Sequence, residues 1–206
     1  MVGNSDVKKA YVGNTVVWES LSPLRTLYYT STSGQVIDMQ QSGITSNTNV
    51  DGRGIITFSY DVTEIASYAF NSKYYLTSVI IPDGVTIIGN YSFSNCWGLS
   101  SITIPQNVIT ISQEAFAGSH LSSVTIPDNV ININQQAFLS CHYLSSLIIG
   151  NGVTSISHGA FADCTLLSNI EYRGTKSQWA QIQLGETPFA DCPATVIHCS
   201  DGDVPI

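Results

Sequence analysis

Charged side chains are scarce in this chain. Only 11% of its 206 residues are Asp, Glu, Lys or Arg, against roughly 25% in an average soluble domain. Seven Lys and Arg face fifteen Asp and Glu, which gives a net charge of −8. A nucleic-acid backbone or an anionic membrane surface needs clustered Lys and Arg, so we expect neither as a partner. Ser, Thr, Asn, Gln and Gly must cover the surface instead.

Long apolar runs are also missing. No stretch approaches the roughly 18 residues of a membrane span, so we expect none. The first residues, MVGNSDVKKAYVGN, are polar and lack the apolar core of a secretory signal. We therefore expect no signal peptide in this chain. Hydrophobic residues still make up 43% of the total, which predicts a folded core.

Catalytic signatures are absent as well. The chain contains no G-x-S-x-G, H-E-x-x-H, P-loop or G-x-G-x-x-G, and DGRG at 51–54 indicates only a turn. The low charge leaves few acid or base candidates. No C-x-x-C pair is present, although structural zinc sites commonly use one. We expect no enzyme activity, no cofactor and no metal site.

What the sequence does contain is a repeat. Phenylalanine recurs at 70, 93, 116, 138 and 161, with intervals of 23, 23, 22 and 23 residues. Other apolar positions recur at the same spacing, and we call each such set a column. The columns are Leu76, Leu99, Leu121 and Leu144; Val79, Ile102, Val124 and Leu147; Ile81, Ile104, Ile126 and Ile149; Val85, Val108, Val130 and Val153; and Ile88, Ile111, Ile133 and Ile156.

The spacing of these columns predicts one structural unit per repeat. Two apolar positions in alternation indicate a strand. Pro82, Pro105 or Pro127 then ends it, because proline cannot donate to a ladder. The next two columns indicate a short return segment, and Ala-Phe indicates one helical or 3₁₀ turn with its Phe inward. One such coil cannot bury its own apolar residues, so we predict a β-rich solenoid of stacked coils of about 23 residues.

The segments before the repeat predict β-structure. Gly13-Asn14 lies between two β-like runs and indicates a hairpin within residues 1–20. Residues 24–39 suggest a second hairpin. Residues 55–70 fit the repeat register, with Ile56 and Phe58 at the strand positions.

After the repeat, TKSQWAQI (175–182) predicts a short helix with a capping box of Thr175 and Gln178 and with Trp179 and Ile182 inward. PFADCPATVIH (188–198) predicts a last Phe turn and strand. We divide the chain into a hairpin segment and linker (1–22), an N-terminal capping region (23–52), the repeats (53–172) and a C-terminal cap (173–206).

Four of the five cysteines share one column, three residues after a Phe. One interpretation is a buried column of small apolar side chains, which free cysteine fills well. The alternative is a bridge between neighbouring coils, Cys141–Cys164 or Cys164–Cys192. Cys199 follows the last strand and is either exposed or paired with Cys192. The column consists of Cys96, Cys141, Cys164 and Cys192, with Ser119 in the third coil.

The position after the cysteine column carries Tyr74, Trp97, His142 and Thr165. The third repeat is one residue shorter than the others, and His120 belongs to this column only if the missing residue lies after it. One hypothesis is a ladder of rings that contacts a glycan or a protein. A sharper version is a metal pair of His120 and His142. The alternative is that the rings only cover the coil edge. Departure from regularity is predicted between Phe116 and Leu121.

The outward residues of the predicted strands form a second candidate surface. We expect one continuous, polar and nearly uncharged ladder on this face. It suits broad contact with a protein or carbohydrate more than a deep pocket, although Ser and Thr also simply stack well on a sheet. Its central members are Ser101, Thr103, Ser123, Thr125, Ser146 and Ile148. Residues 78 and 80 continue it at one end, and residues 169 and 171 at the other.

The repeat pattern L-x-x-(V/I)-x-I-P-x-x-V-x-x-I-x-x-x-A-F-x-x-C resembles the BspA-like leucine-rich repeats of bacterial surface proteins, over residues 53–172. The flanks, LYYTSTSGQVI and IEYRGTKSQWAQI, resemble gut Bacteroidales members. The resemblance implies a leucine-rich-repeat stack and a non-catalytic protein at the cell surface or secreted. It also implies adhesion to a host or matrix protein or a glycan. A structural spacer that presents another module is the alternative, and the oligomeric state stays open.

Overall fold

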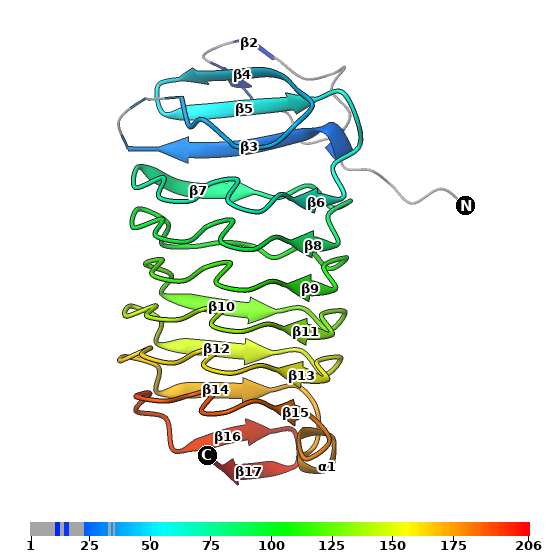
Figure 1. Ribbon diagram of the computed structural model, residues 1–206, viewed down its shortest axis with the longest axis vertical. Coiled ribbons are helices and arrows are strands. Elements are labelled where there is room, and N and C mark those ends of the chain that lie inside the picture. The colour runs from blue at the N-terminus through cyan, green and yellow to red at the C-terminus, as the bar shows by residue number, and fades with distance from the viewer. Residues whose placement is uncertain (1–10, 13–14, 17–22, 33, 35) are drawn as a thin grey trace, which may run out of the picture.

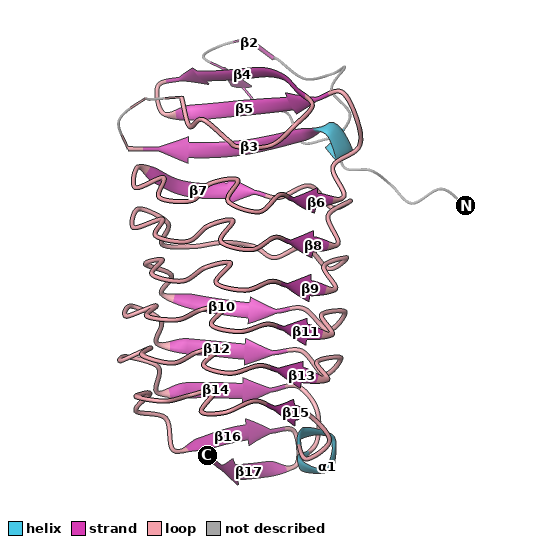
Figure 2. Cartoon of the chain, in the orientation of Figure 1, coloured by secondary structure: helices cyan, strands magenta, loops and turns pink. Residues whose placement is uncertain are grey.

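The chain winds into an elongated stack of coils, with the N-terminal strands at one end and the only α-helix of the described residues near the other (Figure 1). The structure is a computed structural model, and it describes residues 11–12, 15–16, 23–32, 34 and 36–206. Strands and turns make up nearly all of these residues (Figure 2). The predicted solenoid with a spacing of about 23 residues is confirmed.

Two parallel sheets run along the stack, one strand per coil. Successive partners lie one repeat apart, as in Val124↔Leu147 and Leu147↔Ile170. The longer parallel strands are β10 (Ser123–Ile126), β12 (Ser146–Ile149), β14 (Asn169–Tyr172) and β16 (Val196–Cys199), and β7 (Leu76–Ile80) takes the same position in its coil but belongs to the N-terminal antiparallel sheet. The short return strands, in spatial order, are β6 (Glu64–Ile65), β8 (Ile87–Ile88), β9 (Thr110–Ile111), β11 (Asn132–Ile133), β13 (Ser155–Ile156) and β15 (Gln183–Leu184).

The sheet of longer strands is interrupted at one coil. Where a strand is expected at residues 101–104, only a single bridge joins Thr103 to Ile80, and regular pairing resumes at Ser123. The expected continuous ladder is therefore wrong at this coil. The interruption lies beside the one 22-residue interval, in which Leu121 follows Phe116 one residue early.

Stacked phenylalanines form the centre of the core. Phe70, Phe93, Phe116, Phe138 and Phe161 have no exposed surface. Their ring centroids lie 5.1–5.3 Å apart, with interplanar angles of 2–12°. Phe189 continues the column at 5.5 Å. The predicted Leu, Val and Ile columns surround the rings, so each coil buries its apolar residues against the next.

The backbone of each Phe turn is held from one coil to the next. N–H groups donate to carbonyls of the following coil, as from Phe93 to Ala115 (2.7 Å) and from Phe116 to Ala137 (2.8 Å). Residues two before and two after each Phe have φ between +47° and +67°. This left-handed backbone prevents a continuous helical segment. The segments are successive single turns in which an N–H donates three residues back, as from Asn71 to Tyr68 at 3.1 Å, so they form the 3₁₀-like turns that the sequence predicted without a continuous helix.

An antiparallel sheet covers the first coil. Strands β4 (Ile44–Val50), β5 (Arg53–Phe58), β3 (Thr26–Ser31) and β7 lie in that order. A 3₁₀ turn, η1 (Pro23–Arg25), precedes β3. The predicted pairing within residues 1–20 is seen as β1 (Tyr11–Val12) against β2 (Thr15–Val16), while its turn at 13–14 lies outside the described residues.

Two predictions about this sheet are wrong. Residues 24–39 do not form a hairpin, because β3 pairs with β5 and β7. Residues 36–39 instead lie against Tyr29, whose hydroxyl accepts the N–H of Ile37 at 3.0 Å. Residues 55–58 are not the strand of a first coil either, since β3 separates β5 from β7. Ile56 and Phe58 are nevertheless in the core.

The C-terminal cap agrees with its prediction. Helix α1 (Lys176–Trp179) has the capping box of Thr175 and Gln178, and Trp179 and Ile182 are buried. Strand β17 (Gly202–Pro205) then pairs antiparallel with β16 and closes the sheet edge. Among the described residues, no helix has the length and apolar character required to cross a membrane.

Candidate functional site

The outward residues of the longer strands form an exposed strip, which we call the strand face. It consists of Ser101, Thr103, Ser123, Thr125, Ser146 and Ile148. Ser123 lies opposite Ser146, and Thr125 lies opposite Ile148, on paired strands. Ser101, Thr103, Ser123 and Thr125 are exposed, whereas Ser146 and Ile148 are half-buried. The structure thus places all six predicted residues on one strip without a charged side chain among them, although Ser101 and Thr103 lie at the interrupted coil.

Aromatic rings line the coil edge just before the strand face. We call Tyr74, Tyr75, Trp97, His120, His142 and Tyr143 the aromatic edge. Two pairs of rings are in contact across neighbouring coils. Tyr74 and Trp97 have centroids 4.6 Å apart at 37°, and His120 and Tyr143 have centroids 4.5 Å apart at 49°.

This arrangement corrects the single ring column expected from the sequence. His120 contacts Tyr143, one position beyond His142, because the 22-residue interval loses its residue before His120. The predicted irregularity between Phe116 and Leu121 therefore appears as a one-position step in the ring column. Sequence reasoning missed Tyr143, and alignment on the Leu column instead of the Phe column would have found it.

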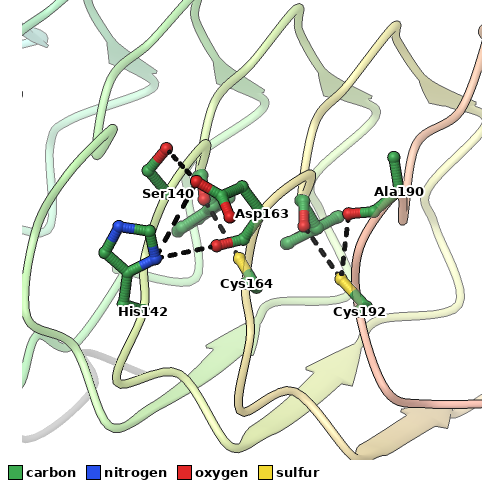
Figure 3. Close-up of polar contacts among 8 residues, drawn as sticks. Ser140, His142, Asp163, Cys164, Ala190 and Cys192 are labelled. Atoms are coloured by element: carbon green, nitrogen blue, oxygen red, sulfur yellow. Dashed lines mark hydrogen bonds and ion pairs between the residues drawn. The ribbon is translucent and has the colours of Figure 1, made fainter.

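His142 is held by its own neighbours. Its Nδ1 lies 3.0 Å from the backbone carbonyl oxygen of Asp163 and 3.9 Å from the side-chain Oδ2 of the same residue (Figure 3). This Oδ2 also accepts a hydrogen bond from the Ser140 hydroxyl at 2.9 Å. His120 lies in a different column. No group of three His, Cys, Asp or Glu able to hold a metal exists in the part of the chain that the structure describes. The geometry gives no support to the His120–His142 metal pair.

Serine hydroxyls join the aromatic edge to the strand face. Ser122 Oγ donates to Ser100 O at 3.4 Å, and Ser145 Oγ donates to Ser122 O at 3.1 Å. Ser122 and Ser145 each lie two residues after a ring of the aromatic edge and directly before a residue of the strand face. The aromatic edge, the serine row and the strand face therefore form one neutral surface across successive coils.

Comparison with known families decides what kind of repeat this is. The profile described as BspA type leucine rich repeat region matches residues 63–196 in six copies. The chain belongs to the BspA-type leucine-rich repeat family. No curated protein matches it.

Solved structures of bacterial proteins resemble this BspA-type chain. A leucine rich cell surface protein of Faecalibacterium prausnitzii is 38% identical over 61% of the chain and 34% of its own length, with a TM-score of 0.58. The Treponema pallidum leucine rich repeat protein is 22% identical over 70% of the chain and 73% of its own length, with a TM-score of 0.48. A Bacteroides ovatus leucine-rich repeat protein is 22% identical over 72% of the chain and 48% of its own length, with a TM-score of 0.44. The chain spans about a third of the length of the Faecalibacterium protein.

The cysteine column of this BspA-type stack is a column of free thiols. Cys96, Cys141 and Cys164 are buried, and Cys192 is half-buried. Each Sγ donates to the carbonyl of a Phe in the preceding coil at 3.0–3.2 Å. The predicted apolar packing is confirmed, and the alternative bridges are not formed. Cys199 is also free, but it is the last residue of β16 and does not follow the strand as expected.

Burial and thiol contacts change the acidity of this column. Burial raises the pKa of the Cys96 thiol to about 12. Hydrogen bonding with Cys141 and Cys192 raises the pKa of Cys164 far above its ordinary value. The same contact with Cys164 lowers the pKa of Cys192. The thiols of Cys96 and Cys164 therefore stay protonated, whereas hydrogen bonding with Cys164 lowers the pKa of both of its neighbours in the column, Cys141 and Cys192.

The remaining ionisable candidates are dispersed. His198 Nδ1 lies 2.9 Å from Asp203 Oδ1, and Asp201 accepts the backbone N–H of Lys176 at 2.7 Å. His158 lies 4.0 Å from Glu186. His158 and His198 are both exposed.

A shallow depression on the side of the return strands is a feature that the sequence did not reveal. Asn107 and Asn129 form its polar wall, and each amide donates to a carbonyl of the preceding coil, at 2.7 and 2.8 Å. Ile109 and Ile131 are 45% and 40% exposed and form its floor. The depression is open to solvent along its length, and its lining is completed by Gly84 and Thr86.

Proposed function

We propose that this chain is a non-catalytic binding module of a cell-surface or secreted protein. Its partner would be a host or matrix protein or a glycan, bound through the strand face and the aromatic edge. The observation that supports this proposal is the extent of the neutral, exposed surface that the two form together. Rigid solenoids with short-chained, uncharged faces suit broad contact with an extended partner.

Family membership supports the location in this proposal. The similar Faecalibacterium protein is described as a leucine rich cell surface protein. Because the chain spans only about a third of that protein, its partners are not transferred from it. The low charge of the chain also disfavours nucleic acid as a partner.

The dispersal of ionisable groups supports the non-catalytic part of the proposal. A catalytic site brings acid, base or nucleophile together in a concave pocket. In the described residues, His142, His158 and His198 are exposed, and each lies beside a different carboxylate. Cys192, the half-buried thiol at the end of the column, donates to the carbonyl oxygens of Phe161 and Ala190.

A structural spacer remains the second candidate function, since a stack of coils also holds other modules apart. Under that alternative the surface would be inert, and only the length of the stack would matter. The two proposals therefore differ in what surface substitutions do.

Charged substitutions on the strand face test the proposal. Binding of the wild type to a panel of immobilised matrix proteins and glycans is compared with that of Thr103→Arg/Thr125→Arg. The matched control is Thr86→Arg/Thr154→Arg, which places the same charges on the return-strand side. We expect loss of at least one binding activity in the first double variant only. Equal binding by all three proteins would contradict the proposed surface, and no binding by any would favour the spacer.

A further inference from the structure

We infer that the aromatic edge binds a neutral, extended polysaccharide whose chain runs along the stack axis. This inference deepens the proposed function and rests on it. It commits to one partner chemistry, a chain of uncharged pyranose rings, and to one part of the surface.

Exposed aromatic rings are concentrated at this edge. In the described part of the chain, six Tyr and Trp side chains are at least 39% exposed, and four of them lie on the aromatic edge. These four are 46–54% exposed: Tyr74, Tyr75, Trp97 and Tyr143. Exposing so much ring surface on adjacent coils leaves apolar area unburied that a partner would cover. The apolar C–H faces of a pyranose are a suitable partner for such rings.

The spacing of the rings suits a chain of repeating units. Each ring sits on a coil that the Phe column and the return-strand sheet hold in place, and coils rise by about 4.8 Å. The contacting pairs have centroid distances of 4.6 and 4.5 Å, close to that rise. A β-1,4-linked glycan advances by a comparable distance per sugar. Two pairs of neighbouring coils therefore each present two rings to successive sugars: Tyr74 and Trp97, and, after a one-position step, His120 and Tyr143.

The polar surroundings of the rings are neutral hydrogen-bonding groups. Ser122 and Ser145 use their hydroxyl protons on carbonyls, so their oxygens remain acceptors for sugar hydroxyls. Asp163, the acidic residue nearest His142, is already engaged by that ring and by Ser140. No cluster of Lys or Arg lies at the edge to attract a sulfated or carboxylated glycan, and the chain's net charge of −8 would repel one.

Calorimetric titration with cello-oligosaccharides of two to six sugars tests this inference. We expect affinity to rise with chain length up to about four sugars and then to level off, because each ring contributes one contact. Chondroitin sulfate, a polyanion, should not bind. Maltohexaose, whose α-linked chain curves, should bind more weakly than cellohexaose.

Variants locate the site. Trp97→Ala and Tyr143→Ala should each weaken cellohexaose binding about tenfold, which corresponds to the upper range for one aromatic contact. Trp97→Tyr should retain most of the affinity. Tyr68→Ala is the matched control, because Tyr68 is 49% exposed but precedes the Phe turn instead of following it. It should bind as the wild type does, and circular dichroism checks that every variant is folded.

The outcomes separate this inference from the proposed function. Failure of the wild type to bind any cello-oligosaccharide, with matrix-protein binding intact, overturns the glycan assignment and leaves the binding module standing. Equal loss in Trp97→Ala and Tyr68→Ala, or no loss in Trp97→Ala/Tyr143→Ala, overturns the location. Stronger binding of maltohexaose than of cellohexaose overturns the extended geometry.

Discussion

Each central phenylalanine of the repeat lies parallel to another on both sides. Phe116 contacts Phe93 at 5.3 Å and Phe138 at 5.1 Å and has no exposed surface. Phe189, at the end of the column, contacts a repeat Phe on one side only and is 7% exposed. The position of a ring in the column should therefore determine how much its removal lowers the free energy of unfolding.

We expect Phe116→Ala to lower the free energy of unfolding by about 3–5 kcal/mol, the usual range for emptying an aromatic site in a core. Phe189→Ala should cost less, because the chain end can relax around the cavity. Urea denaturation followed by circular dichroism measures both. An equal or larger loss for Phe189→Ala would contradict the role of stacking from both sides.

The buried thiol of Cys96 predicts a pH dependence. Burial raises its pKa from the ordinary 9.0 to about 12 in the folded state. Above pH 9 the unfolded state loses this proton while the folded state keeps it, so the free energy of unfolding falls between pH 9 and about 12. Urea titrations across this range should show a shallower fall in Cys96→Ala than in the wild type. Parallel curves would contradict the assignment.

At the scale of the element, the Phe turn depends on left-handed residues that are not glycine. Among the twelve such positions, two before and two after the six Phe residues, only Gly118 and Gly159 are glycines. A non-glycine residue in this conformation carries a cost of about 1 kcal/mol. The coil-to-coil hydrogen bonds of the turn offset it.

Adjacent glutamines provide a matched test of this strain. Gln136 has φ +56°, whereas Gln135 does not have a positive φ. We expect Gln136→Gly to be nearly neutral or stabilising, because relief of strain offsets the entropy lost by glycine. Gln135→Gly should destabilise by about 0.5–1 kcal/mol. Thermal unfolding of the two variants gives the difference, and a more harmful Gln136→Gly would contradict the account.

The elements that the sequence predicted are those encoded locally. The capping box of Thr175 and Gln178 lies within one helical turn, and the strand and return columns repeat in register, so both were predictable. The left-handed turns were not, since Tyr, Glu and Gln give no local sign of positive φ. The partner of β3 was not predictable either, because alternation indicates a strand but does not specify which distant segment pairs with it.

At the scale of the whole molecule, each coil packs against its neighbours, and the exposed pair of Arg173 Nη1 and Asp128 Oδ1 at 3.5 Å is a contact that spans two coils. Stability should then be a sum of coil and interface contributions, and a complete coil should be removable. Residues 122–144 form such a unit, because their removal joins Leu121 to Ser145 just as Leu144 is joined to Ser145 in the chain.

We expect the chain without residues 122–144 to fold, to unfold at a lower urea concentration, and to be shorter by about 4.8 Å. Removing only residues 122–133 should abolish cooperative unfolding, because the following strand then loses its register. Small-angle scattering and urea denaturation give these two readouts. Cooperative, native-like unfolding after the half-coil deletion would contradict the stack of equivalent units.

The candidate surface was predictable where the repeat is regular. The strand-face residues and Trp97 follow directly from their columns. Tyr143 was missed and the column of His120 was left open because a one-residue gap can be placed before or after His120 in the sequence. Only the stacked coordinates show which rings are in contact.

Hydroxyl-radical footprinting of the unmodified protein with and without its bound partner tests most directly whether this surface binds. Trp97, Tyr143 and Tyr68 are 53%, 54% and 49% exposed, so all three are comparably accessible without a partner. We predict that the partner slows oxidation of Trp97 and Tyr143 and leaves Tyr68 unchanged. Protection of Tyr68 with unchanged oxidation of Trp97 and Tyr143 would contradict the account.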